Sequence, residues 1–189
     1  VFEIASLPPC VPGMRLNNKL VATAKNERVD YVLGSKVTGC TVADGKVVSV
    51  TVGTAGAGKE IKADAVVLAG GGFESGALKL DSHGHLHETI LDLPVTMPEG
   101  VKEEDLIHGD YWGSPQPLFL CGVEVDETML VTYQGKPVHS NVYAAGGVIA
   151  GATRWQEKSG EGIALGSAIK AADAILSSVG AGAATKERN

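Results

Sequence analysis

Two glycine clusters directly follow apolar segments of the sequence, at 63–69 and at 141–145. Each segment has the composition of a short buried strand, so each cluster predicts a turn at the carboxyl end of a strand. Glycine lets a ligand approach the backbone closely, and open α/β sheets bind ligands at the carboxyl ends of their strands. We therefore expect both turns to line one crevice. The glycines concerned are Gly70, Gly71, Gly72, Gly146 and Gly147.

The predicted start of the last helix is a third candidate for chemistry. Apolar residues at helical spacing predict this helix from about Gly160 to Ser178. Its first N–H groups and the positive end of its dipole would stabilise an anionic group. The residues at this start are Ser159, Gly160, Glu161 and Gly162. The predicted buried stripe comprises Leu165, Ala168, Ile169, Ala172, Ile175 and Leu176.

Both glycine clusters also have a purely structural interpretation. Residues 70–72 would serve as a tight turn between a strand and a loop, and residues 146–147, with Gly151, would let a helix pack closely on a strand. The order of the two clusters before one helix start favours the ligand-binding interpretation. In that interpretation Phe73, directly after the first cluster, belongs to the same site.

Other side chains with chemical potential show weaker patterns. His83, His85 and His87 alternate and would share one face of a strand, but no nearby Cys or paired carboxylate completes a metal site. We expect an exposed ribbon there, and no metal. Three charged residues between the second glycine cluster and the helix either face a cofactor or a phosphate-bearing substrate, or form a solvated loop. They are Arg154, Glu157 and Lys158.

Composition limits the class of protein. The chain has 189 residues, of which 44% are hydrophobic and 20% charged, as expected for one soluble globular domain or slightly more. The net charge of -6 is dispersed and no Lys/Arg run is present, which argues against a nucleic-acid partner. The longest apolar stretch, Val142 to Ala152, is too short to span a bilayer. Three cysteines without Cys-x-x-Cys spacing predict reduced thiols and a cytoplasmic protein.

The remaining pattern predicts an α/β fold. We expect an amphipathic helix from Met14 to about Lys25 and a short strand from Val29 to Leu33. A three-strand meander should follow over 36–62, turning at Asp44-Gly45. Residues 76–121 lack periodicity and predict an irregular lobe inserted before the second glycine-ended strand.

This order of elements resembles the later portion of the FAD/NAD(P)-binding flavoprotein fold. The motifs are most similar to those of the B subunits of anaerobic glycerol-3-phosphate dehydrogenases, chiefly G-G-F-x-S-G at 71–76 and A-A-G-x-x-x-A-G at 144–151. The chain departs from the wider group at Ala69-Gly70-Gly71, where many relatives carry Ala-Thr-Gly. It also lacks the G-x-G-x-x-G segment that seats a pyrophosphate. We therefore interpret it as the C-terminal part of a longer protein, and expect the isolated part to be inactive.

The resemblance implies a flavin, FMN before FAD, held by the glycine turns, by Phe73 and by the helix start. The helix dipole would then stabilise the anionic charge of the reduced flavin. The catalytic base stays unassigned. Residues 1–75 and 122–180 would form part of the flavin-binding domain, with 1–12 as its lead-in. Residues 76–121 would be a substrate or partner lobe, and residues 181–189 a flexible tail.

For activity, the resemblance implies oxidation of glycerol 3-phosphate to dihydroxyacetone phosphate. Electrons would pass through the flavin to an iron–sulfur subunit anchored at the membrane and on to quinone, with a catalytic sibling subunit in the complex. The chain itself would be cytoplasmic, reaching the inner face of the membrane only through its partners.

Two alternatives stay open. In the first, the chain is a non-catalytic assembly or electron-transfer module whose lobe contacts the partner subunits through Tyr111 and Trp112. In the second, it belongs to a flavin enzyme of the fumarate-reductase type, which needs an Arg/His cluster for a dicarboxylate. The scarcity of arginine disfavours the second. The arginines are Arg15, Arg28, Arg154 and Arg188.

Overall fold

In the computed structural model of the chain, the backbone is described for residues 10–53, 58–110 and 113–186, and side chains are described as far as residue 178. The chain divides into two compact units, Val1–Ser35 and Lys36–Asn189. Most of the predicted lead-in, the residues Tyr111 and Trp112 and the last three residues of the predicted tail lie outside the described residues.

The described residues of the first unit contain one helix, α1 (Val11–Asn26), as the helical spacing predicted. It begins earlier than Met14 because Cys10 caps it: the Cys10 Sγ accepts the Gly13 N–H at 3.4 Å. The predicted strand from Val29 to Leu33 is wrong. That segment is irregular and its apolar side chains are exposed, since no described strand pairs with it. A strand without a neighbour has no partners for its backbone groups.

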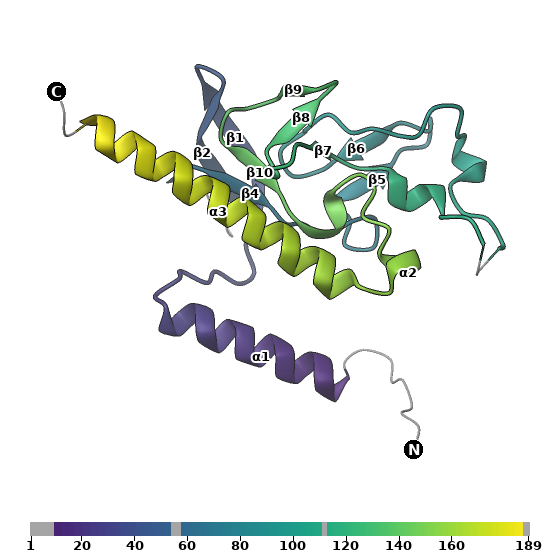
Figure 1. The fold of residues 1–189 in the computed structure, drawn as a ribbon, viewed down its shortest axis with the longest axis horizontal. Helices are drawn as coiled ribbons and strands as arrows, with labels where there is room; N and C mark the ends of the chain where they lie inside the picture. The colour runs from purple at the N-terminus through teal and green to yellow at the C-terminus, as the bar shows by residue number, and fades with distance from the viewer. Residues whose placement is uncertain (1–9, 54–57, 111–112, 187–189) are drawn as a thin grey trace. The chain divides into compact units, whose positions relative to one another are not determined.

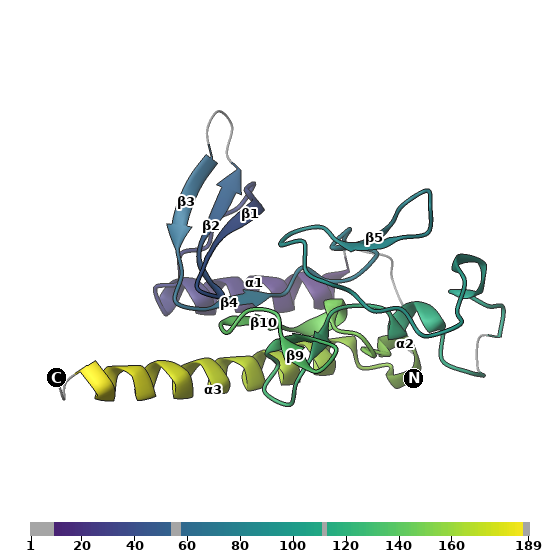
Figure 2. The same ribbon diagram turned by 90° about the horizontal axis from the view of Figure 1, so that it is seen from above.

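The second unit opens with the predicted meander. Strands β1 (Lys36–Ala43), β2 (Lys46–Gly53) and β3 (Gly58–Lys62) pair antiparallel in that order (Figure 2). Asp44 and Gly45 both have positive φ, at 50° and 72°, as a two-residue type I′ turn requires. The hairpin predicted from the Asp-Gly dipeptide is thus confirmed.

A two-stranded parallel sheet lies beside the meander. It joins β4 (Val66–Leu68) to β10 (Val142–Ala144), with Val66 opposite Val142. Both predicted glycine-ended strands are therefore confirmed, and they are direct neighbours. The helix α3 (Gly160–Lys186) runs along this sheet and contacts β10 (Figure 1). The prediction that β4 is fully buried is wrong for Val67, which is 41% exposed.

Helix α3 differs from its prediction in two respects. It continues to Lys186 instead of ending at Ser178, so the predicted flexible tail is helical over 181–186. Its predicted stripe is wrong: only Ile175 is half-buried, and the other five members are exposed. The helix instead contacts the unit through a face that includes Ser167 and the fully buried Ala171. Periodicity located an apolar face, but α3 has more than one.

The rest of the second unit is built from short elements. The described residues of 76–110 and 113–121 are largely irregular, as predicted, apart from one hairpin and two 3-10 turns. A second antiparallel sheet follows, and a short helix precedes α3. These elements are β5 (Leu78–Leu80), β6 (Leu86–Glu88), η1 (Glu103–Asp105), η2 (Pro117–Leu120), β7 (Glu124–Val125), β8 (Val131–Tyr133), β9 (Lys136–Pro137), η3 (Gly146–Val148) and α2 (Arg154–Glu157).

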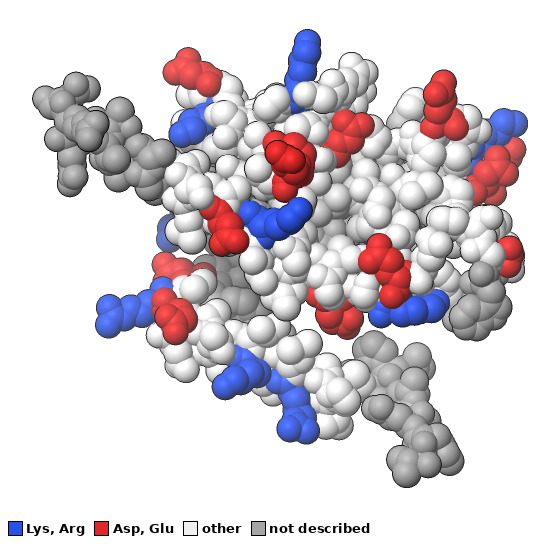
Figure 3. Space-filling model, viewed as in Figure 1, with Lys and Arg blue, Asp and Glu red and all other residues white. Residues whose placement is uncertain are grey.

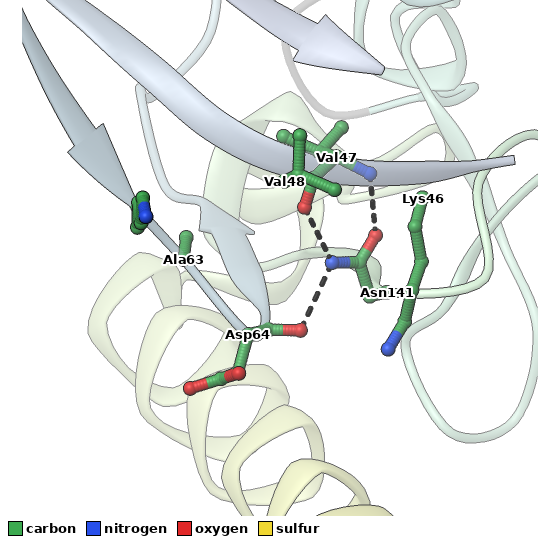
Figure 4. A pocket seen from close by; sticks show the side chains of 7 residues that line it. Lys46, Val47, Val48, Ala63, Asp64 and Asn141 are labelled. Atoms are coloured by element: carbon green, nitrogen blue, oxygen red, sulfur yellow. Dashed lines mark hydrogen bonds between the residues drawn. The ribbon is translucent and has the colours of Figure 1, made fainter. Parts of the chain in front are cut away.

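Asn141 ties the meander to the parallel strands. Its side-chain carbonyl accepts the Val47 N–H at 2.9 Å, and its amide donates to the carbonyl oxygens of Val47 at 2.8 Å and Asp64 at 2.9 Å (Figure 4). Asn141 is only 4% exposed. A buried amide with these three partners fixes the position of β2 relative to β4 and β10.

The surface carries charges of both signs (Figure 3). On the face drawn in Figure 3, acidic and basic side chains are scattered among uncharged ones, apart from a few neighbouring basic side chains along α1. Within the described part of the chain, no helix is both long enough and apolar enough to cross a membrane.

Candidate functional site

The two predicted glycine turns meet. A methyl group placed on Gly72 would lie 3.0 Å from the carbonyl oxygen of Gly147, so the two backbones approach each other with no room for a side chain. They meet because β4 and β10 are adjacent and parallel, which brings their carboxyl ends to the same edge. Of the glycines in the two clusters, Gly72 and Gly147 make this close approach.

Gly70 and Gly71 have a different role from Gly72. The space where Gly70 would carry a side chain is filled by Ile90 and Ala77. Gly71 has a φ of 82°, and the Ser75 hydroxyl lies 2.6 Å from the Gly70 carbonyl oxygen and closes the turn. For these two glycines the geometry matches the alternative interpretation, a tight turn between a strand and a loop.

Gly146 and Phe73 also contact other parts of the fold: Gly146 contacts α3, and Phe73 contacts the hydrophobic core. The Gly146 N–H donates to the Ser167 hydroxyl of α3 at 2.9 Å, and a methyl group on Gly146 would lie 3.7 Å from the Cβ of Ala164. Close packing of a helix on a strand end, the alternative considered for this cluster, describes Gly146. Phe73 is half-buried and packs against the hydrophobic core.

Arg154 occupies the place where the two turns meet. Its guanidinium Nη2 donates to the Glu74 carboxylate at 2.6 Å, and its Nη1 lies against Gly147. The cation also lies over the Phe119 ring, 5.2 Å from the ring centre. The side chain is 22% exposed, so the positive charge is held in place yet accessible to solvent.

The start of α3 adjoins Arg154. The Ile163 N–H donates to the Ser159 carbonyl at 2.9 Å, which marks Ser159 as the residue before the first helical turn. The N–H groups of residues 160–162 precede that first bond and belong to the helix terminus. A methyl group on Gly160 would lie 3.8 Å from the Arg154 Cβ. The positive end of the helix dipole and the Arg154 guanidinium, which is paired with Glu74, therefore lie in one locality.

The structure thus brings together part of the predicted site and adds residues that the sequence did not single out. Gly72 and Gly147 adjoin each other and Arg154, and Gly160 adjoins Arg154. The sequence left two interpretations of the charged segment at 154–158, and in one of them Arg154 faces a ligand. Its partners Glu74 and Phe119 were missed, because they are 80 and 35 positions away and only the fold brings them to Arg154.

The alternating histidines form a separate arrangement on the β5–β6 hairpin. Asp81 accepts the backbone N–H groups of His83 at 2.8 Å and His85 at 2.9 Å, and its second oxygen faces the rings of His85 and His87. Hydrogen bonding, first of all from the His85 backbone, holds the pKa of the Asp81 carboxyl well below its usual range. Among the residues that the structure describes, no group of three metal-ligating side chains is arranged to hold an ion.

The cavity beside Asn141 is a structural feature. It has a volume of about 280 Å³, and its lining includes Lys46, Lys62 and Asp64 (Figure 4). Both amide hydrogens and the carbonyl of Asn141 are already engaged by backbone groups. Asn141 therefore acts as a clamp between strands and does not present these groups to a ligand.

Comparisons with known proteins identify relatives of the chain. Curated relatives that are named as the B subunit of anaerobic glycerol-3-phosphate dehydrogenase occur in Actinobacillus pleuropneumoniae, 29% identical, and in Haemophilus influenzae, 28% identical, each over 93% of the chain. A relative in Halobacterium salinarum, named as a probable B subunit of such a dehydrogenase, is 28% identical over 95% of the chain. The chain spans only 41%, 40% and 41% of these three relatives' lengths. No solved structure matches the chain.

The match to a protein family covers more than half of the chain. The model of a family described as FAD binding domain matches residues 1–163. This stretch includes both glycine turns, Arg154 with its partners Glu74 and Phe119, and the first turn of α3. The chain therefore belongs to the family of FAD-binding domains.

Proposed function

We propose that the chain is part of an FAD-dependent oxidoreductase that oxidises glycerol 3-phosphate to dihydroxyacetone phosphate. The observation that carries this proposal is the convergence of Gly72, Gly147, Arg154 and the start of α3 at one edge of the parallel sheet. The membership of the family and the names of the relatives supply the chemistry. The family description supports FAD, whereas the resemblance in the sequence had put FMN first.

The described residues fit the ring end of a flavin. A bound flavin supplies an acceptor for two electrons and carries negative charge when it is reduced. The helix start at Gly160 and the Arg154 guanidinium provide the positive potential that would stabilise this charge. This sequence has no comparable binding segment for the phosphate end of the cofactor, because no G-x-G-x-x-G segment occurs in it.

Arg154 is the residue that we expect to recognise the anionic group. Its pairing with Glu74 and its stacking on Phe119 fix the plane of the guanidinium before a ligand arrives. A guanidinium that is already oriented loses less conformational freedom when it binds an anion. The closely packed turns at Gly72 and Gly147 keep side chains out of the same place.

The arrangement of domains and the partner chains are also part of the proposal. Residues 1–75 and 122–180 would contribute to the flavin-binding domain, and residues 76–121 would face substrate or partner subunits. The relatives are named as subunits, which supports assembly with other chains. We propose a catalytic sibling and an iron–sulfur subunit at the membrane as those chains, with quinone as the final acceptor. The 189 residues alone would then be inactive.

A specific observation favours a second function, a non-catalytic assembly module. Three large apolar side chains among the described residues of the lobe are open to solvent, Ile107 at 67%, Met97 at 37% and Leu120 at 37% exposure. Such side chains suit an interface with another subunit. A flavin enzyme of the fumarate-reductase type gains less support. Arg154 is the only arginine among the described residues of the second unit, so no arginine cluster accompanies it there.

Bleaching of the flavin by substrate tests the proposal. The protein, as its gene encodes it and with the subunits that purify with it, would be mixed with glycerol 3-phosphate without oxygen, and the visible absorbance followed. We expect glycerol 3-phosphate to bleach a flavin band, and expect glycerol and succinate to leave it unchanged. Bleaching by succinate instead would favour the fumarate-reductase type. A preparation whose flavin none of the three reduces would favour the assembly module.

A further inference from the structure

The net negative charge of the chain is concentrated in the lobe, residues 76–121, and is not dispersed as the sequence first indicated. The lobe has eight acidic and two basic side chains, so its net charge equals the -6 of the whole chain. The rest of the chain is therefore neutral overall. Six of the eight acidic side chains are exposed, namely Asp92, Glu99, Glu103, Glu104, Asp105 and Asp110.

The lobe uses its other two carboxylates to hold its own backbone. Asp81 accepts the N–H groups of His83 and His85, and the buried Glu88 accepts those of Ile90 at 2.7 Å and Leu91 at 2.8 Å. The exposed carboxylates have weaker compensation. Lys102 lies 3.7 Å from Glu104, but the two side chains are 75% and 76% exposed, and an ion pair so open to solvent contributes little.

An open cavity of about 700 Å³ lies among these exposed acids. Leu80 and Met97 line it with apolar side chains, and Lys102, Glu103 and Glu104 line it with charged ones. The tip of the β5–β6 hairpin and η1 meet at this cavity, because a methyl group on Gly84 would overlap the Glu103 side chain. The Met97 side chain is 37% exposed. The cavity thus offers an apolar contact in acidic surroundings.

We propose that this cavity binds a segment of another protein chain in which a large apolar side chain is flanked by Lys or Arg. The apolar side chain would pack on Leu80 and Met97, and the flanking cations would pair with Glu103 and Glu104. A methionine suits this task because its flexible side chain adapts to the shape of a partner. The inference rests on the proposed function for the existence of partner chains, since the relatives are named as subunits.

The charge of the lobe selects the class of partner. A second copy that docked through the same surface would bring two lobes of charge -6 together, which repels. Nucleic acids and anionic membrane surfaces are negatively charged and are repelled for the same reason. A protein segment with positive charge around an apolar side chain complements both features of the cavity.

Charge reversal tests the electrostatic part of the proposal. The protein as its gene encodes it would be titrated with the subunits that purify with it, at about 50 mM and about 500 mM salt. We expect Glu103→Lys with Glu104→Lys to weaken binding at least about tenfold at the lower salt, and less at the higher salt because ions screen the interaction. Glu27→Lys with Glu127→Lys makes the same change of charge at exposed positions outside the lobe. Equal effects of the two pairs would overturn the proposal.

A neutral substitution tests the apolar part. Met97→Ser changes no charge, so it should weaken binding at least about fivefold at both salt concentrations through lost apolar contact. Circular dichroism would check that the variant keeps the fold of the natural protein. A folded Met97→Ser variant that binds as tightly as the natural protein would overturn the proposal.

Cross-linking identifies the occupant of the cavity. A photoreactive residue at Met97 should attach to another subunit, at a segment with Lys or Arg next to the attachment point. Attachment to the same polypeptide, to a second copy or to a segment without basic residues would overturn the proposal, as would purification of the protein with no other chain. These readouts measure binding, so a negative result here leaves reduction of the flavin by glycerol 3-phosphate as a separate test of the proposed function.

Discussion

Arg154 and Glu74 join two segments that lie 80 residues apart, with 2.6 Å between Nη2 of the arginine and Oε2 of the glutamate. Glu74 follows the glycine turn after β4, and Arg154 follows the turn after β10. The ion pair therefore crosses the edge at which the two glycine turns meet. It also orients the Arg154 guanidinium, which lies against both Gly72 and Gly147.

Replacing Arg154 should impair the site much more than the fold. The variant Arg154→Gln loses a partly exposed ion pair and a cation–π contact, which together contribute about 1 kcal/mol to the free energy of unfolding. Loss of a charged hydrogen bond to a ligand should weaken binding of an anionic group by about tenfold to a hundredfold. Urea unfolding and flavin reduction by glycerol 3-phosphate measure the two effects. Arg15→Gln on α1 is the control, and an equal loss of reduction in both variants would contradict the assignment.

Gly72 should tolerate no side chain. A methyl group there would lie 2.8 Å from Arg154 Nη2 and 3.0 Å from the Gly147 carbonyl oxygen, so Gly72→Ala must move either the guanidinium or the second turn. We expect a loss of about 1–3 kcal/mol in the free energy of unfolding, as for other overpacked sites. Gly39→Ala is the matched control, since nothing lies within 4 Å of the added methyl group and its φ is not positive. Equal stability of the two variants would show that the turns do not meet in solution.

The sequence predicted the parts of this site that depend on local pattern. Both glycine-ended strands, the meander and the start of α3 follow from alternation, apolar runs and the Asp-Gly turn. The partners of Arg154 did not follow, because Glu74 and Phe119 are distant in the sequence and share no spacing with it. The face of α3 that is covered was also not predictable: with apolar residues on two sides, periodicity alone does not say which side contacts β10.

The predicted strand at 29–33 failed for a related reason. Val29, Tyr31 and Val32 have high strand propensity, but a strand forms only where a neighbour accepts its hydrogen bonds. No described strand pairs with this segment, and all three side chains are exposed. High strand propensity alone therefore does not make this segment a strand, because the partner that would stabilise it is missing among the described residues.

Asn141 should be essential for the junction of β2 with the parallel strands. Asn141→Leu removes three hydrogen bonds and leaves the buried N–H and carbonyl of Val47 without their partner. The expected loss is about 2–5 kcal/mol in the free energy of unfolding, from the desolvation cost of those groups. Ser140→Ala is the control, since its hydroxyl is exposed and makes one long hydrogen bond of 3.5 Å. Denaturant unfolding of both variants should separate them clearly, and a difference below about 1 kcal/mol would contradict the role of Asn141 as a clamp.

Cys121 should make the protein less stable at high pH. Burial raises the pKa of its thiol from 9.0 to about 11, because the thiolate is poorly solvated in the core. The folded state therefore favours the protonated thiol. The stability that this contributes is complete below pH 9.0 and is lost as the pH rises through about 11. Thermal unfolding across this range should show a steeper loss for the natural protein than for Cys121→Ala. Parallel pH profiles would contradict the prediction.

The reactivity of the thiols gives an independent check. Cys121 is 2% exposed, and Cys10 is half-buried next to the start of α1. A thiol reagent at neutral pH should modify Cys121 only after unfolding, since both access and thiolate formation are restricted. Mass spectrometry of the modified peptides measures this. Rapid modification of Cys121 in the folded protein would show that the segment after η2 opens.

The most direct test of the central claim is the identity of the cofactor in the protein as its gene encodes it. The visible absorbance spectrum of the purified protein would be recorded, the bound cofactor released and then separated by chromatography. We predict a flavin spectrum and release of FAD, with less flavin retained by Gly72→Ala than by Gly39→Ala. A colourless protein that also fails to take up added FAD would contradict the claim that the glycine turns and Arg154 form a flavin site.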